Sequence, residues 1–277
     1  MKKTSPNISF SVLSAFIAGL FMVLTACNTS QKKQESTAEV TEDTSQKEAI
    51  IEELSGYPLP TSFEITKLIQ EAGAPYILTL SNVPDQAGNY ITQKEKALNL
   101  GVYGTDLCYA STYMMKQATL QFLEATRTLI DELGISTRFN VNYVNRIENN
   151  LDNRDSLIYI VSDSFYDTWE YLVQNRQDIL ARLVVSGSWI EGIYITANIA
   201  QTSRDNSDFL EILANQKTSL NKLLALLEPV KDREEISDII KGLYDLQAIY
   251  EEVGESMTTE QLEQVADSIE ILRSSIV

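Results

Sequence analysis

Two acidic residues stand inside segments that are otherwise apolar and rich in small side chains. Asp106 lies in KALNLGVYGTDLCYAST, and Glu191 lies in LVVSGSWIEGIYITANIA. A carboxylate on such a helix must be hydrogen-bonded by tyrosine or amide groups or must face a polar cavity, because an unpaired buried charge is costly. The offset that aligns Asp106 with Glu191 also aligns Tyr109 with Tyr194. A candidate site for a small ligand or a cation therefore consists of Asp106, Tyr109, Glu191 and Tyr194.

Other catalytic and metal-binding arrangements are absent from the sequence. The chain has no histidine, which removes Ser-His-Asp and Cys-His nucleophiles and the mixed Cys/His zinc sites. The segment Asp152-Asn-Arg-Asp155 lacks the glycine and the terminal glutamate of an EF-hand. Cys108 lies on a small-residue stripe with no base nearby in sequence, so we expect a buried, inert thiol. We predict no catalytic residue, no metal, no cofactor and no enzymatic activity.

Thirteen tyrosines provide a second kind of candidate contact. Two groups of them lie close together in the sequence: Tyr103, Tyr109 and Tyr113, and Tyr159, Tyr166 and Tyr171. Such rings could contact a carbohydrate or another ligand. Rings that pack between helices and keep the hydroxyl end wet are the simpler interpretation.

Helices are the elements that must position these side chains. The two segments that contain the acids each carry a stripe of small residues at helical spacing, formed by Ala97, Gly101, Thr105, Cys108 and Thr112 and by Ser188, Gly192, Thr196 and Ala200. A glycine inside a helix costs up to about 1 kcal/mol relative to alanine, so we expect close helix packing at these stripes. Two buried helices in one bundle are the preferred arrangement, and two quasi-repeated halves are the alternative.

Helix starts and stops recur along the rest of the chain. Capping-box spacing begins at Thr61, Thr92 and Thr258, and glycine or proline stops follow the apolar stripes. Apolar residues recur at spacings of three and four between these signals, and strand-like alternation is nearly absent. We interpret residues 75–80 as helical as well. The sequence predicts an all-α fold, a multi-helix bundle or helical array of about eight to ten helices.

The N-terminus has the layout of a secretory signal. Lys2 and Lys3 precede an apolar run that is shorter than the roughly 20 residues needed by a membrane-spanning helix. Leu24-Thr25-Ala26 then stands directly before Cys27, which resembles the lipobox of bacterial lipoproteins. The resemblance implies cleavage before Cys27 and a lipid-modified thiol, with acyl chains such as palmitate that hold the protein at a membrane. A cysteine on a buried core helix and an uncleaved membrane helix are the alternatives.

Composition bounds the possible partners. The chain has 22 basic and 39 acidic residues, a net charge of −17, which argues against nucleic acid as a partner because nucleic acid binds clustered Lys and Arg. The same acidity argues against electrostatic attraction to anionic lipid, so the lipid anchor would provide the membrane attachment. Asn28 after the cysteine, rather than Asp, favours the outer membrane in the lipoprotein family.

Three regions follow from these patterns. Residues 1–26 form the predicted lipoprotein signal peptide, and residues 27–48 form the lipidated cysteine with a polar, flexible tether that has no aromatic residue. Residues 49–277 form the predicted soluble all-helical domain. The stretches YPLPTSFEITKLIQEAGAPYILTLSN, KALNLGVYGTDLCYASTYMMKQ and SGSWIEGIYITA are similar to a group of helical bacterial lipoproteins, which implies a helical domain behind a lipid anchor but no particular activity.

The exported, helical imelysin-like proteins are also similar, because they contain an internally duplicated bundle. Their Gly-x-His-x-x-Glu motif has no counterpart here, since Gly104-Thr105-Asp106 lacks the histidine. Taken together, the sequence predicts a lipid-anchored cell-envelope protein that is a non-enzymatic interaction or structural module, with an envelope protein as a candidate partner. The alternative is a ligand- or cation-binding envelope protein with a pocket between the small-residue helices.

Overall fold

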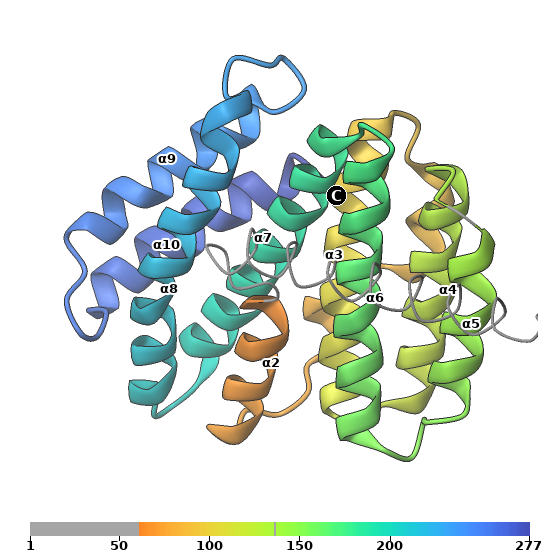
Figure 1. Cartoon of the computed structure of the whole chain (residues 1–277). Coiled ribbons are helices and arrows are strands. Elements are labelled where there is room, and N and C mark those ends of the chain that lie inside the picture. Colours follow the sequence, from red (N-terminus) through yellow and green to blue (C-terminus); the bar gives the residue numbers. More distant parts are fainter. Residues whose placement is uncertain (1–60, 136) are drawn as a thin grey trace, which may run out of the picture. The chain divides into compact units, whose positions relative to one another are not determined.

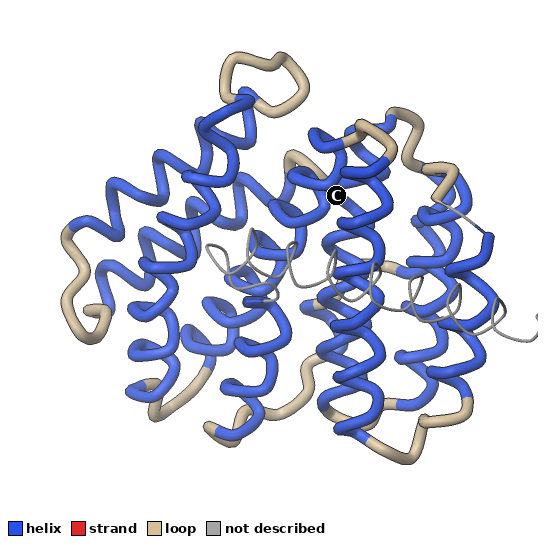
Figure 2. Tube along the Cα trace, in the orientation of Figure 1, coloured by secondary structure: helices blue, strands red, loops and turns tan. Residues whose placement is uncertain are grey.

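The computed structural model describes residues 61–135 and 137–277, all within one compact unit, Gln46–Val277. This described part is helical throughout, with connecting loops and no strand (Figures 1 and 2). The α-helices are α2 (Thr61–Glu71), α3 (Gln93–Thr112), α4 (Lys116–Glu132), α5 (Thr137–Glu148), α6 (Arg154–Gln174), α7 (Asp178–Thr202), α8 (Ser207–Leu227), α9 (Ser237–Glu251) and α10 (Thr259–Ser274). The 3₁₀ helices are η1 (Leu78–Leu80), η2 (Pro84–Asn89) and η3 (Glu228–Val230). The predicted all-α, multi-helix fold is confirmed.

Several predictions concern residues outside this described part. The signal peptide (1–26), Cys27, the tether (27–48) and the start of the helical domain (49–60) all lie there, as does the side chain of Thr61, which begins the first capping box.

Local capping explains where two of the long helices begin. The Thr92 hydroxyl accepts a hydrogen bond from the backbone N–H of Glu95 at 3.1 Å, and the Glu95 carboxylate accepts one from the N–H of Thr92 at 2.8 Å. Thr258 and Gln261 make the same reciprocal pair at the start of α10. Each box satisfies two backbone donors that a helix start leaves unpaired. These two predicted helix starts are confirmed.

The helix predicted over residues 75–80 is wrong. Residues 74–92, which we call the strap, join α2 to α3 as an irregular segment that contains only η1 and η2. Pro75 has no backbone N–H and disfavours helical geometry in the residue before it. Ile77 is extended, with φ −119° and ψ 96°. Its backbone N–H donates to the Tyr109 hydroxyl of α3, and its carbonyl accepts from the Leu80 N–H of η1.

The helices form two groups with the same order of packing. In the first group α3 packs on α4, α4 on α5, α5 on α6, and α6 returns to α3; in the second, α7, α8, α9 and α10 repeat this cycle. The most extensive contact in the fold joins the first helix of each group, α3 and α7, and α2 packs beside both (Figure 1). α3 and α7 are thus two buried helices packed on each other, as preferred from the sequence, and each also begins one of two groups with the same order of packing.

The predicted small-residue stripes allow α3 and α7 to approach closely. A Cβ atom added to Gly101 of the predicted stripe would lie 2.0 Å from the carbonyl oxygen of Val184. Gly187, which was not among the predicted stripe residues, makes the matching contact on α7: a Cβ atom there would lie 2.0 Å from the carbonyl oxygen of Leu98. The Thr105 hydroxyl lies 3.0 Å from the Ser188 hydroxyl and also bonds the Ser188 carbonyl at 3.1 Å. Glycine is therefore required at both positions because backbone occupies the space of a side chain.

Among the described helices, α7 has the length and apolar composition of a membrane span. Most of it is buried against α3, α2, α8 and α10. A helix that is apolar on all sides is expected at the centre of a large water-soluble fold as well as in a membrane. The packing explains its composition without a membrane.

Candidate functional site

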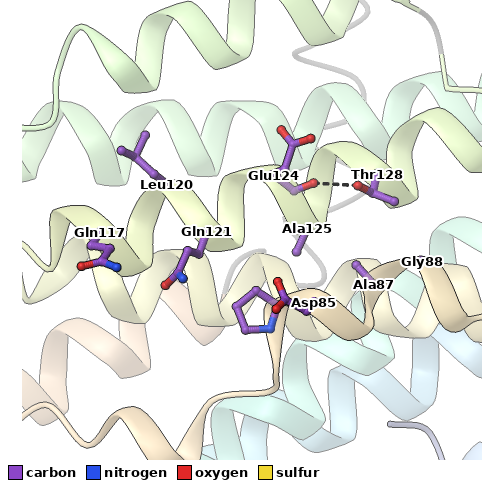
Figure 3. A pocket seen from close by; sticks show the side chains of 10 residues that line it. Asp85, Ala87, Gly88, Gln117, Leu120, Gln121, Glu124, Ala125 and Thr128 are labelled. Atoms are coloured by element: carbon purple, nitrogen blue, oxygen red, sulfur yellow. Dashed lines mark hydrogen bonds between the residues drawn. The ribbon is translucent and has the colours of Figure 1, made fainter.

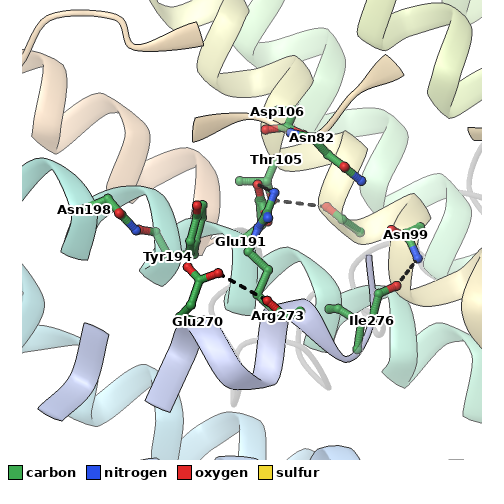
Figure 4. Close-up of polar contacts among 12 residues, drawn as sticks. Asn82, Asn99, Thr105, Asp106, Glu191, Tyr194, Asn198, Glu270, Arg273 and Ile276 are labelled. Carbon is green, nitrogen blue, oxygen red and sulfur yellow. Dashed lines mark hydrogen bonds and ion pairs between the residues drawn. The ribbon is translucent and has the colours of Figure 1, made fainter. Parts of the chain in front are cut away.

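A buried ion pair joins the central helix α7 to the last helix, α10. The Arg273 guanidinium donates to both carboxylate oxygens of Glu191, from Nε at 2.6 Å and from Nη2 at 3.0 Å. Glu191 is fully buried and Arg273 nearly so. Arg273 also lies over the ring of Tyr194, with Cζ 4.1 Å from the ring centroid (Figure 4). Two-point hydrogen bonding and the ring face hold the guanidinium in one position.

Asp106 on α3 is the second carboxyl group of this centre. It is fully buried, and its Oδ2 accepts a hydrogen bond from the backbone N–H of Asn82 at 3.0 Å. Burial and the neighbouring Glu191 carboxylate raise the pKa of Asp106 well above its ordinary value. Burial also raises the pKa of Glu191, but the Arg273 guanidinium opposes that rise.

Arg273 favours the ionised form of Glu191, to which it donates two hydrogen bonds, whereas burial favours the protonated form of Asp106. In that state the three side chains carry no net charge, which removes most of the cost of burying them. We call Asp106, Glu191, Tyr194 and Arg273 the polar centre.

Side chains on one face of α3 bind the backbone of the strap. The Tyr113 hydroxyl donates to the Ala74 carbonyl at 2.9 Å, and the Tyr103 hydroxyl donates to the Val83 carbonyl at 2.7 Å. Between them, the Tyr109 hydroxyl accepts from the Ile77 N–H at 2.9 Å. Together with the Asp106–Asn82 bond, these contacts satisfy backbone groups of a segment that has no regular secondary structure. The hydroxyls of Tyr103, Tyr109 and Tyr113 thus bond the strap.

The structure brings all four sequence-predicted residues to one region. Asp106, Glu191 and Tyr194 belong to the polar centre, and Tyr109 lies close enough to Asp106 for that carboxyl group to influence its pKa. Sequence reasoning missed Arg273. Arg273 stands four residues after Ile269 and three before Ile276, which are both buried. This helical spacing predicts that Arg273 faces inward, and it was the signal that could have identified the residue.

Cys108 has the properties expected of an inert thiol. It is fully buried, and its sulfur lies 3.4 Å from the Thr66 hydroxyl and 3.9 Å from that of Thr112. Burial raises the pKa of the thiol to about 12. The nucleophilic thiolate is therefore not populated at neutral pH.

Metal-ligating side chains do not converge in the described part of the chain. No group of three or more His, Cys, Asp or Glu residues there could hold a metal ion. The two carboxyl groups of the polar centre face Arg273, so its guanidinium stands where a bound cation would compensate their charge.

Two surface cavities lie away from the polar centre. The larger, about 560 Å³, is an open groove between η2 and α4 that we call the η2–α4 groove. Pro84, Ala87 and Leu120 contribute apolar lining, while Asp85, Gln121 and Glu124 contribute polar lining (Figure 3). The second, about 360 Å³, lies between α2 and α6. Both volumes fall in the range of small-molecule sites, about 300–1,000 Å³.

Comparison with protein-family models, with curated proteins and with solved structures found no match in any of the three.

Proposed function

We propose that this chain is a lipid-anchored cell-envelope protein whose helical domain is a non-enzymatic interaction or structural module. The observation that carries the proposal is that both buried carboxyl groups are bonded to other parts of the same chain. Glu191 binds Arg273 through both oxygens, and Asp106 binds the strap. Groups that join α3, α7, α10 and the strap are engaged in holding the fold together. The Cys108 thiol is protonated and buried.

The surface around the η2–α4 groove supports an interaction role. The groove has apolar lining, and the adjoining strap exposes Leu78, Val83 and Ile91 to solvent. Exposed apolar side chains are common at protein contact sites. We propose this groove and the exposed strap residues as the contact surface for an envelope protein.

The alternative function is ligand or cation binding at the polar centre. Its support is the convergence of Asp106, Glu191 and Tyr194 in one buried place. A ligand there would have to displace Arg273 or the strap. For this reason we rank it second.

The anchor is tested with the two cysteines as a matched pair. Cys27→Ser should abolish fatty-acid labelling and give an uncut or soluble product, because the thiol that would carry the lipid is gone. Cys108→Ser should keep both labelling and membrane association. Fractionation of cells and the mass of the mature N-terminus give the readout. Unchanged membrane association of Cys27→Ser would refute the anchor.

The interaction surface is tested by photo-crosslinking in intact cells. A photoreactive residue at exposed Gln121, in the groove, should yield a discrete adduct with an envelope protein. The same residue at exposed Asp245, on α9, serves as the control. Identical adduct patterns at the two positions, or none at Gln121, would argue against the groove as a contact surface.

A further inference from the structure

The cavity between α2 and α6 lies where these two helices pack on either side of α3. Both helices pack on α3, and Thr112, in the last turn of α3, forms part of the cavity lining. Lys67, Gln70 and Glu71 line one wall, and Arg154, Asp155 and Tyr159 line the other. We call it the α2–α6 cavity. At about 360 Å³ it has room for a small ligand.

The charges that line this cavity are already compensated. Lys67 lies 3.7 Å from Glu71, and Arg154 lies 3.8 Å from Asp155. Two cations and two carboxylates leave the lining with no net charge, although the whole chain carries −17. A charged ligand would find no net counter-charge in this lining. The lining therefore favours a neutral ligand.

Polar groups from both walls are arranged for hydrogen bonding. Arg154 Nη1 donates to Gln70 Oε1 at 3.2 Å, which links α6 to α2 and orients the Gln70 amide. The amide N–H groups of Gln70 can then donate, and the carboxylates of Glu71 and Asp155 can accept. Donors and acceptors close together on two walls suit a ligand with several hydroxyl groups.

The cavity also has an exposed aromatic ring. Tyr159 is 65% exposed, more than Tyr244 at 42%, and these are the exposed aromatic residues of the described part of the chain. A ring left in water forgoes the stabilisation of burial. Placed among planar polar groups, it offers an apolar face to a ligand whose edge is polar.

We propose that the α2–α6 cavity binds a neutral saccharide. The apolar face of one sugar ring packs on Tyr159, and the sugar hydroxyls bond Gln70, Glu71 and Asp155. A saccharide has both required properties, an apolar ring face and a hydroxyl edge, and it leaves the existing ion pairs intact. The proposal does not depend on the lipid anchor or on the η2–α4 groove, so binding by the purified chain tests it separately.

The test uses saturation-transfer NMR on the full-length chain with N,N′-diacetylchitobiose and maltose at millimolar concentration. At least one sugar should bind, and Tyr159→Ala should weaken binding about tenfold or more. Tyr159→Phe should bind within about twofold of the original chain, because it keeps the ring. Tyr244→Ala, on α9, removes the other exposed ring and should leave binding unchanged.

Two further measurements distinguish a polymeric from a soluble saccharide and a saccharide from a zwitterionic ligand. Sedimentation with insoluble cell-wall saccharide in place of the free sugars distinguishes a polymer from a soluble sugar, and binding of either that is lost in Tyr159→Ala supports the proposal. Glycylglycine is the zwitterionic probe. Binding of glycylglycine but no saccharide, no binding of any saccharide, or saccharide binding unaffected by Tyr159→Ala would each overturn it. Unchanged thermal unfolding of Tyr159→Ala shows that the variant is folded.

Discussion

The polar centre and the α2–α6 cavity use the same residue types at opposite ends of solvent exposure. In the polar centre the Arg273 side chain is 10% exposed and Glu191 is fully buried, with contacts of 2.6 and 3.0 Å. In the cavity Arg154 is 47% exposed and Asp155 92% exposed, with 3.8 Å between them. The first pair holds helices together, whereas the second leaves hydrogen-bonding groups accessible to a ligand.

The difference follows from the energetic cost of desolvation. A buried charge that loses its partner is uncompensated, so breaking such a pair is expensive even when forming it contributed little. An exposed pair exchanges its partner for water at little cost. An arginine–carboxylate contact therefore indicates a structural role in one place and an available surface in the other. Substitutions at both places test this contrast.

Glu191→Gln should have the largest effect. It keeps the shape of the side chain but leaves the Arg273 guanidinium buried without its counter-charge, so we expect a loss of about 3–5 kcal/mol in the free energy of unfolding. Urea unfolding of the full-length chain measures it. The double variant Glu191→Met with Arg273→Met removes both charges and should recover most of that loss. A loss below 1 kcal/mol in the single variant would contradict the structural role of the pair.

Gly101→Ala should be the next most damaging change. Its Cβ would lie 2.0 Å from the Val184 carbonyl oxygen and 2.6 Å from the Ser188 nitrogen, so α3 and α7 must separate. We expect a loss of about 1–3 kcal/mol or more, measured by thermal unfolding. Gly104→Ala is the control on the same helix, because its Cβ would meet only the Phe165 ring at 3.4 Å. Equal destabilisation by the two alanines would argue against backbone contact as the cause.

Asp106→Asn should change the pH dependence of stability more than its magnitude. The folded chain binds the Asp106 proton more tightly than the unfolded chain, because burial and Glu191 raise its pKa. The free energy of unfolding therefore falls as pH rises from the ordinary aspartate pKa, about 3.9, through the raised pKa of the folded state.

Asparagine has no such proton to lose. Relative to the original chain, Asp106→Asn should gain stability as pH rises through that window, as unfolding curves at several pH values would reveal. A pH-independent difference between the two proteins would mean that folding does not raise the pKa of Asp106.

Arg154→Ala should have the smallest effect on stability. Its contacts with Asp155 and Gln70 are exposed, so we expect a change of about 0–1 kcal/mol in urea unfolding. Arg273→Ala is the matched comparison for the same residue type in the polar centre. If the two arginine variants lost equal stability, the contrast between the two regions would be wrong.

Local signals explain how much of the fold was predictable. The capping boxes at Thr92 and Thr258 depend on residues three positions apart, and the apolar stripes reveal which helix faces are buried. The strap was predicted wrongly for the opposite reason. Its backbone is satisfied by Tyr103, Asp106, Tyr109 and Tyr113, which follow it in the sequence and belong to another element. Local propensity contains no information about such partners.

In the candidate site, too, some features follow from nearby residues and others from distant elements. Sequence pattern alone determined the all-helical architecture, the close-packing stripes on α3 and α7, and the presence of two acids in apolar surroundings. Tertiary structure alone decided that Arg273, 82 residues from Glu191, neutralises the pair and that Arg154 and Tyr159 remain exposed at a cavity. The physical reason is that helix formation depends on neighbours within a few residues, whereas the pairing and desolvation of a charge depend on which distant helix packs against it.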